Sequence, residues 1–240
     1  QDGKLPPTLA PEQEKNITYQ SDQDFEDGYP RTPEETARGL KPKGGRGAYA
    51  YALDGTPLIR VRESFTDDPH LTLILSHELL HTLVRWSDPP VDLDEGATQL
   101  LALFAQDPRR PLSESIIDDG LVYVSETNNL NDLLAQIAGE QRVPLLAAAF
   151  LRNDSAQLDA KINARLSPGE DIGRYIFLAG FNRSWPNAIG GRAVPPRNKQ
   201  LANEDPIATV FGLLDGTRSL VKNTRKNVFY IRRSVPLTSR

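Results

Sequence analysis

The stretch HLTLILSHELLHTLVRW, residues 70–86, predicts the helix around which we interpret the rest of this chain. Apolar residues occupy most of its positions, which is typical of a helix that is buried on most sides. Asp67 or Asp68 can cap its N-terminus, with Pro69 at the first helical position. The Asp-Pro-Pro run at residues 88–90 stops it. The polar residues in its middle form one short cluster: Ser76, His77, Glu78 and His81.

This cluster contains a His-Glu-x-x-His motif, which indicates a metal site. His77 and His81 are four residues apart, so both lie on one face of the predicted helix and both rings can reach one ion. Glu78 lies on an adjacent face, from which it can reach a metal-bound water without binding the metal. The alternative is a buried helix whose His and Glu side chains pair only with one another. The apolar surroundings make that alternative costly, because buried polar groups need partners.

A third metal ligand has to come from outside the motif. The chain has three histidines, none of them after His81, and it has no methionine, so the metzincin pattern is excluded. The nearest downstream carboxylates are those of Asp88, Asp92, Asp94 and Glu95. Capping offers another explanation for Asp94 and Glu95, because acidic residues are common in the first turn of a helix.

The segment LDEGAT, residues 93–98, together with the His-Glu-x-x-His motif resembles the gluzincin peptidases. Thermolysin-like and aminopeptidase members of that family place the third zinc ligand in a similar Asn/Asp-Glu-Gly segment that opens a second helix. The resemblance implies that the zinc ligands are His77, His81 and Glu95. It implies that Glu78 is the general base of a zinc-dependent metalloendopeptidase with a peptide or protein substrate. A carboxylate in the first turn of a helix packed on the histidine helix is held rigidly, and Gly96 would let the two helices approach closely.

The sequence departs from the gluzincin pattern in three respects. Only 13 residues separate His81 from Glu95, so a tight loop at residues 86–93 has to connect the two helices. Gln99 stands where thermolysin-like proteins have an acid that supports a ligand histidine. The downstream histidine that stabilises the oxyanion in those enzymes is missing.

Another donor is therefore needed for the oxyanion, and Tyr or Arg is the expected type. The candidates are Tyr123, Arg174, Tyr175 and Tyr230. We favour Tyr175, because it opens a predicted helix in the C-terminal half, where gluzincins usually keep this group. The alternative is that Tyr175 packs in the core.

The predicted fold class is α+β, and the resemblance implies a zincin-like arrangement: a small N-terminal antiparallel or mixed sheet packed on the active-site helix, and a mostly helical C-terminal half. Asp54-Gly55 between two β-prone runs, 48–53 and 57–62, predicts a hairpin. The second run has one polar face with Arg60 and Arg62, as expected for an edge strand that could bind extended substrate. Ordinary solvation would explain that face equally well.

Apolar periodicity predicts the elements of the C-terminal half. Helices are expected at 128–138, 144–151, 155–166 and 169–181, and strands at 121–125 and 227–231. Residues 1–45 are rich in proline and charge, so we expect a flexible arm or a propeptide remnant. The catalytic domain would span 46–240, with the sheet and zinc helices in 46–110 and a helical subdomain with a basic tail in 111–240.

Composition sets outer limits on function. The net charge of −4 argues against a dedicated nucleic-acid binder, and the apolar run at 71–84 is interrupted by Ser76, His77, Glu78 and His81, so no membrane span is expected. The chain has no cysteine and does not begin with methionine, which favours a protein that is secreted or delivered outside the producing cell, such as a secreted peptidase or a toxin domain. We expect a monomer. The basic tail would be either a solvated extension or a surface for anions. The alternatives to a peptidase are a metal-binding, non-proteolytic interaction module and a helical interaction domain without metal.

Overall fold

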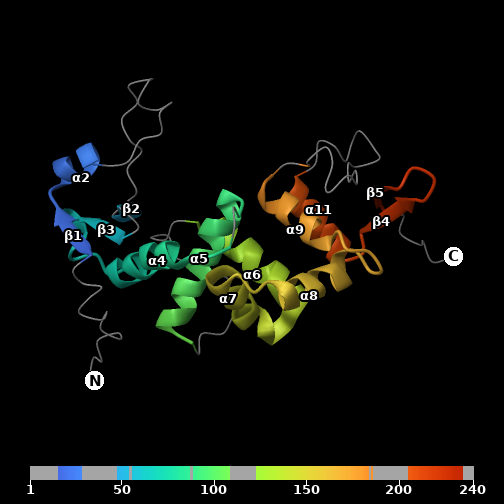
Figure 1. The fold of residues 1–240 in the computed structure, drawn as a ribbon, viewed down its shortest axis with the longest axis horizontal. Helices are drawn as coiled ribbons and strands as arrows, with labels where there is room; N and C mark the ends of the chain where they lie inside the picture. The colour runs from blue at the N-terminus through green and yellow to red at the C-terminus, as the bar shows by residue number, and fades with distance from the viewer. Residues whose placement is uncertain are drawn as a thin grey trace. The chain divides into compact units, whose positions relative to one another are not determined.

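The computed structural model describes residues 16–28, 48–53, 56–86, 89–108, 123–183, 185 and 205–234. This part of the chain is α+β, mostly helical, with two small sheets (Figure 1), which confirms the coarse fold prediction. It forms two compact units. The described parts of Gln1–Val84 and Thr98–Pro111 belong to the first, and Arg85–Ala97 and the described part of Tyr123–Arg240 belong to the second. None of the described helices is long and apolar enough to cross a membrane.

The N-terminal sheet has three strands in the order β1-β3-β2. β1 is Ile17–Gln20, β2 is Ala48–Leu53 and β3 is Thr56–Arg62. β2 and β3 pair in antiparallel fashion, which confirms the predicted hairpin, and β1 pairs with β3 in parallel. The sheet is therefore mixed. The Asp54-Gly55 turn lies outside the described residues.

The prediction that residues 57–62 form an edge strand was wrong. β3 is the middle strand, because β1 occupies the edge that the sequence analysis left free. A substrate strand therefore cannot pair with β3 along Ile59 to Val61, where both of its edges are already paired with neighbouring strands. The Arg62 side chain on the polar face of β3 is also covered. The Arg62 guanidinium forms an ion pair of 3.0 Å with Glu26 and lies 4.8 Å from the centroid of the Phe25 ring.

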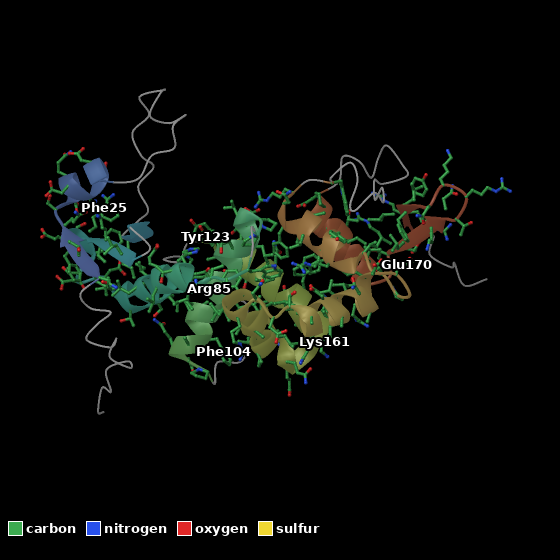
Figure 2. All side chains as sticks on the ribbon, in the orientation of Figure 1. Phe25, Arg85, Phe104, Tyr123, Lys161 and Glu170 are labelled. Carbon is green, nitrogen blue, oxygen red and sulfur yellow. The ribbon has the colours of Figure 1, made fainter. Side chains whose placement is uncertain are left out.

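The expectation of a flexible arm was wrong for residues 17–28. They form β1 and the helix α2, Asp22–Gly28, which begins after Ser21. Phe25 of α2 is fully buried where this helix meets β3 (Figure 2). The rest of the predicted arm, residues 1–15 and 29–45, lies outside the described residues.

The predicted motif helix is α4, Leu71–Leu83, preceded by a 3-10 turn at Glu63–Phe65. One face of it packs on the sheet. The buried sheet residues are Ala48, Ile59 and Val61, and the α4 residues against them are Leu71, Ile74, Leu75 and Leu79. Asp68 supports the helix start, because its carboxylate accepts a 2.7 Å hydrogen bond from the His70 N–H. The buried residues within α4 are Leu73 and His77, so the helix is less enclosed than its composition suggests.

α4 ends three residues before the predicted end. Val84 is extended, and the N–H groups of Arg85 and Trp86 both donate to the Phe150 carbonyl, at 2.9 and 3.2 Å. These tertiary hydrogen bonds replace the helical ones that the apolar pattern implied. Trp86 is itself buried and packs edge-on against the Phe150 ring, with 6.4 Å between the ring centroids.

The second unit is mostly helical, as predicted, and ends in a β-hairpin. Its further elements are α6 (Val124–Ala138), a 3-10 turn (Gly139–Gln141), α7 (Arg142–Arg152), α8 (Ala156–Leu166), α9 (Gly173–Phe181), α11 (Pro206–Leu214), β4 (Arg218–Asn223) and β5 (Val228–Arg233). Fully buried side chains of α6, α7, α8 and α9 form its core, among them Leu134, Phe150, Ile162 and Phe177. The predicted strand at 227–231 is confirmed by β5. The strand predicted at 121–125 was wrong for Val124 and Ser125, which open α6.

The basic C-terminal residues lie largely on the β4–β5 hairpin. Phe229 and Ile231 of β5 are buried and anchor it. Arg218 and Arg233 are directly opposed across the strands. Burial, followed by the charge of Arg233, lowers the pKa of the Arg218 guanidinium below its usual value. Lys222 forms a 2.6 Å ion pair with Glu170.

We expect the substitution Phe25→Ala to lower the free energy of unfolding by about 3–5 kcal/mol, because it removes a fully buried ring. Tyr19→Ala on the adjacent β1 is the matched control. Tyr19 is 46% exposed, so its loss should cost less than about 1 kcal/mol. Urea-induced unfolding of the two variants provides the measurement. Equal, small effects would mean that residues 17–28 do not stabilise the fold.

Candidate metal centre

α4 brings the two predicted histidine ligands together. The Nε2 atoms of His77 and His81 lie 2.9 Å apart. Their ring centroids are separated by 4.6 Å and the rings are inclined by 77°, so the nitrogens converge while the planes stay nearly perpendicular. His77 is 7% exposed and His81 is half-buried. Two neutral imidazoles cannot both present a lone pair at this distance without repulsion, so the pair requires either a proton or a cation between its nitrogens.

The third predicted ligand lies on α5, Val91–Gln106. This helix begins three residues before the predicted start, because the Leu93 and Asp94 N–H groups both donate to the Pro90 carbonyl at 2.9 Å. The acids of its first turn are Asp92 and Asp94, and Glu95 follows them. A first-turn position therefore describes Asp92 and Asp94 but not Glu95.

Ligand atoms of His77, His81 and Glu95 all lie within 4.8 Å of one another. Within the described part of the chain, no other group of three or more His, Asp or Glu side chains has this geometry. Around a tetrahedral zinc ion with bonds of about 2.0–2.1 Å, ligand atoms are about 3.3 Å apart. The Nε2–Nε2 distance of 2.9 Å is shorter than that value, and the 4.8 Å limit of the group exceeds it by about 1.5 Å, so the ligand atoms would have to shift by up to about that amount to close the site. Two imidazoles and one carboxylate form a donor set that fits zinc.

The other carboxylates considered from the sequence are placed differently. The Asp92 carboxylate forms a 2.6 Å ion pair with the Arg183 guanidinium. Asp88 lies outside the described residues, and Asp94 does not belong to the three-residue group. The structure thus brings together the set that the gluzincin resemblance implied.

Gly96 permits a close approach, but to a different helix from the one expected. A Cβ atom at Gly96 would lie 3.0 Å from the backbone carbon and oxygen of Glu126 on α6. The side chain of Glu126 also pairs with Arg183 at 3.3 Å, and Arg183 in turn binds Asp92. The start of α5 is therefore held against α6 by a glycine contact and by an ion-pair network, which limits the movement of the neighbouring Glu95.

Glu78 is half-buried and adjoins the buried ligand His77. It is one position further along α4, about 100° around the helix, so its carboxylate does not share the face of the two histidines. It is absent from the three-residue ligand group.

A residue that the sequence analysis missed contacts His81. The Thr98 hydroxyl lies 3.5 Å from the His81 Nδ1 atom, and Thr98 is fully buried. Gln99 stands where thermolysin-like proteins have an acid that supports a ligand histidine. Gln99 is 5% exposed, and its amide nitrogen has no hydrogen-bond partner among the described residues. The i+3 spacing of Thr98 from Glu95 was a usable signal, because residues three apart lie on one helix face.

The candidates for oxyanion stabilisation lie in the second unit. Tyr175 on α9 is 44% exposed, so the alternative that it packs in the core is wrong. Arg174 has a structural role: it forms a 2.9 Å ion pair with Asp159 and lies 5.5 Å from the Trp86 ring centroid. Tyr123 precedes α6 and is 37% exposed, and Tyr230 is half-buried on β5.

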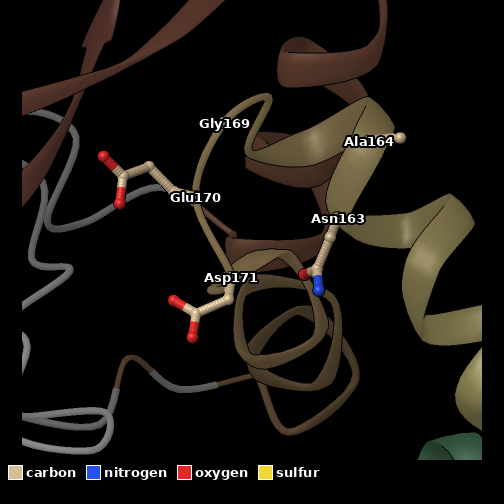
Figure 3. Close-up of a pocket in the computed structure, with 5 residues that line it drawn as sticks. All are labelled: Asn163, Ala164, Gly169, Glu170 and Asp171. Atoms are coloured by element: carbon tan, nitrogen blue, oxygen red, sulfur yellow. The ribbon is translucent and has the colours of Figure 1, made fainter.

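An open pocket of about 330 Å³ lies at the loop between α8 and α9 (Figure 3). Its lining residues are Asn163, Ala164, Gly169, Glu170 and Asp171. Two of its polar groups already have partners in the fold: Glu170 binds Lys222 at 2.6 Å, and the Asn163 side-chain oxygen accepts from the Arg174 N–H at 3.1 Å. In Figure 3 the Glu170 and Asp171 carboxylates extend away from Asn163, so these groups do not converge on one point.

Comparison with known proteins gave no significant match: neither a family model, nor a curated protein, nor a solved structure matches the chain. A metal centre is therefore supported by the geometry of His77, His81 and Glu95 alone.

We expect Glu95→Ala to weaken zinc binding by more than about 100-fold, because changing an outer-shell partner alone costs 10–100-fold. Asp92→Asn is the matched control on the same helix, and it should keep full zinc occupancy. Asp92 pairs with an arginine that is 66% exposed, so this control should also be stable. Elemental analysis of the purified variants checks both expectations. Full zinc in Glu95→Ala would move the third ligand to another carboxylate.

Proposed function

We propose that this protein is a zinc-dependent metallopeptidase with a gluzincin-type site in a zincin-like fold. The observation that carries the proposal is that ligand atoms of His77, His81 and Glu95 lie within 4.8 Å of one another. These are the three positions that correspond to the gluzincin ligands, and they come from two separate helices, α4 and α5. The ion itself would be Zn²⁺, the metal that best suits two imidazoles and a carboxylate with an open fourth position.

Zinc bound in such a site would lower the pKa of a water ligand toward neutrality and polarise the carbonyl of the scissile peptide bond. Glu78 would accept a proton from the attacking water and deliver it to the leaving amine. His77 and His81 would use their Nε2 atoms as ligands, which requires that each carries its proton on Nδ1.

The developing oxyanion would need a donor besides the metal. We assign this role to Tyr175, because its exposure leaves the phenol accessible while Arg174 beside it is engaged with Asp159. The substrate would be a peptide or protein. A metal-binding module without proteolysis would use the same three ligands, but it would give Glu78 no function.

We expect Glu78→Gln to keep zinc and to lower the rate of peptide hydrolysis by about 10²–10⁴-fold, because the amide cannot accept the proton. The assay is cleavage of an unfolded protein by the zinc-loaded enzyme, with the zinc content of the variant measured in parallel. Activity of the wild-type protein should disappear on chelation and return when zinc is added back. Retained activity in Glu78→Gln would refute the general-base assignment.

A wild-type protein that binds one zinc ion and cleaves no unfolded substrate would favour the non-proteolytic module instead. A wild-type protein that binds no zinc would favour a helical interaction domain. Metal stoichiometry and chelator-sensitive cleavage thus separate the three alternatives.

A further inference from the structure

We infer that Thr98 is the positioning residue of this site: its hydroxyl accepts the Nδ1 proton of His81 and so keeps the Nε2 lone pair directed at the metal. The inference rests on the proposed function for the presence of the ion, but it concerns a residue that neither the His-Glu-x-x-His motif nor the Asp-Glu-Gly segment includes.

The Thr98 hydroxyl lies beside the His81 ring. Thr98 Oγ1 lies 3.5 Å from His81 Nδ1, and the residue has no exposed surface. Water therefore does not compete for this side of the ring. The distance is long for an N–H···O hydrogen bond, so we expect it to shorten when the ion draws the His81 ring into place.

Metal binding through Nε2 also demands one tautomer of His81, with the proton on Nδ1. The His81 Nε2 atom faces the His77 Nε2 atom at 2.9 Å, so Nε2 is the His81 nitrogen that would bind an ion shared by the two rings. The remaining proton then sits on Nδ1, where it needs an acceptor. A threonine hydroxyl has two lone pairs and can accept this proton. Partners of this kind fix ring orientation and raise the basicity of the ligand histidine.

The helix that carries Thr98, α5, also carries Glu95. Glu95 and Thr98 are three residues apart on α5, about one turn, so both side chains lie on the same face. One rigid element thus supplies the third ligand and the support for the second. Any displacement of α5 would disturb both interactions together.

The experiment compares the zinc affinity of Thr98→Val, Thr98→Ser and the wild-type protein by competition with a chromophoric chelator. Valine keeps the branched shape and removes the hydroxyl, so we expect zinc binding to weaken by about 10–100-fold. Serine keeps the hydroxyl, so its affinity should stay within about 3-fold of the wild-type value. Thr127→Val is the matched control. Thr127 is also fully buried and donates from its hydroxyl to a backbone carbonyl, that of Tyr123, at 2.7 Å, so zinc affinity should not change.

A second measurement does not depend on the folding of the valine variant. In the zinc-loaded wild-type protein, the Nδ1 proton of His81 should appear in ¹⁵N-edited NMR spectra as a slowly exchanging resonance, because a buried acceptor protects it. Unchanged zinc affinity in Thr98→Val would overturn the inference, and so would equal losses in the valine and serine variants. A rapidly exchanging Nδ1 proton would also overturn it. If the wild-type protein binds no zinc, the proposed function itself fails, which is distinguishable from a zinc protein that is indifferent to residue 98.

Discussion

The structure of the candidate site depends on the approach of two imidazole nitrogens, His77 Nε2 and His81 Nε2, to 2.9 Å on one face of α4. At this separation the lone pairs repel unless a proton or a cation lies between them. His77 is almost fully buried, so water cannot easily relieve that repulsion. A divalent ion would satisfy both nitrogens at once, and the Glu95 carboxylate from α5 would offset part of its charge. Burial of these polar groups is costly unless a shared proton or a cation satisfies both nitrogens.

This arrangement requires that α5 be held in place, and the structure does so through its first turns. Tight turns at Pro90 start the helix, Gly96 lets its backbone meet α6, and Arg183 joins Asp92 to Glu126 by two ion pairs. The Arg183 side chain that both ion pairs share is 66% exposed, so these ion pairs add little stability by themselves. The backbone contact at Gly96 restricts α5 more, because a side chain there would have to displace the Glu126 backbone. A connection of 13 residues between His81 and Glu95 is sufficient under these conditions.

The N-terminal sheet shows where local pattern was misleading. The polar face of residues 57–62 is typical of an edge strand, yet β3 is central. Its Arg62 is covered by Phe25 and Glu26 from α2, which belongs to the stretch 1–45 whose overall charge and proline content resembled a flexible arm. Strand order depends on which distant segment supplies the next set of backbone hydrogen bonds, and a short polar strand such as β1 has no periodicity strong enough to indicate it.

The sequence by itself determined that the two histidines of the candidate centre share one helix face: a spacing of four residues places both rings there, whatever the surroundings, because helix geometry is local. It also determined the mostly helical character of residues 123–183 through apolar periodicity. Only the tertiary structure decided which carboxylate joins the histidines, which helix Gly96 meets, and that Thr98 rather than Gln99 contacts His81. These outcomes depend on how α5 packs on α4 and on α6. That packing is set by side-chain contacts between segments far apart in the chain, and residue spacing does not reveal such contacts.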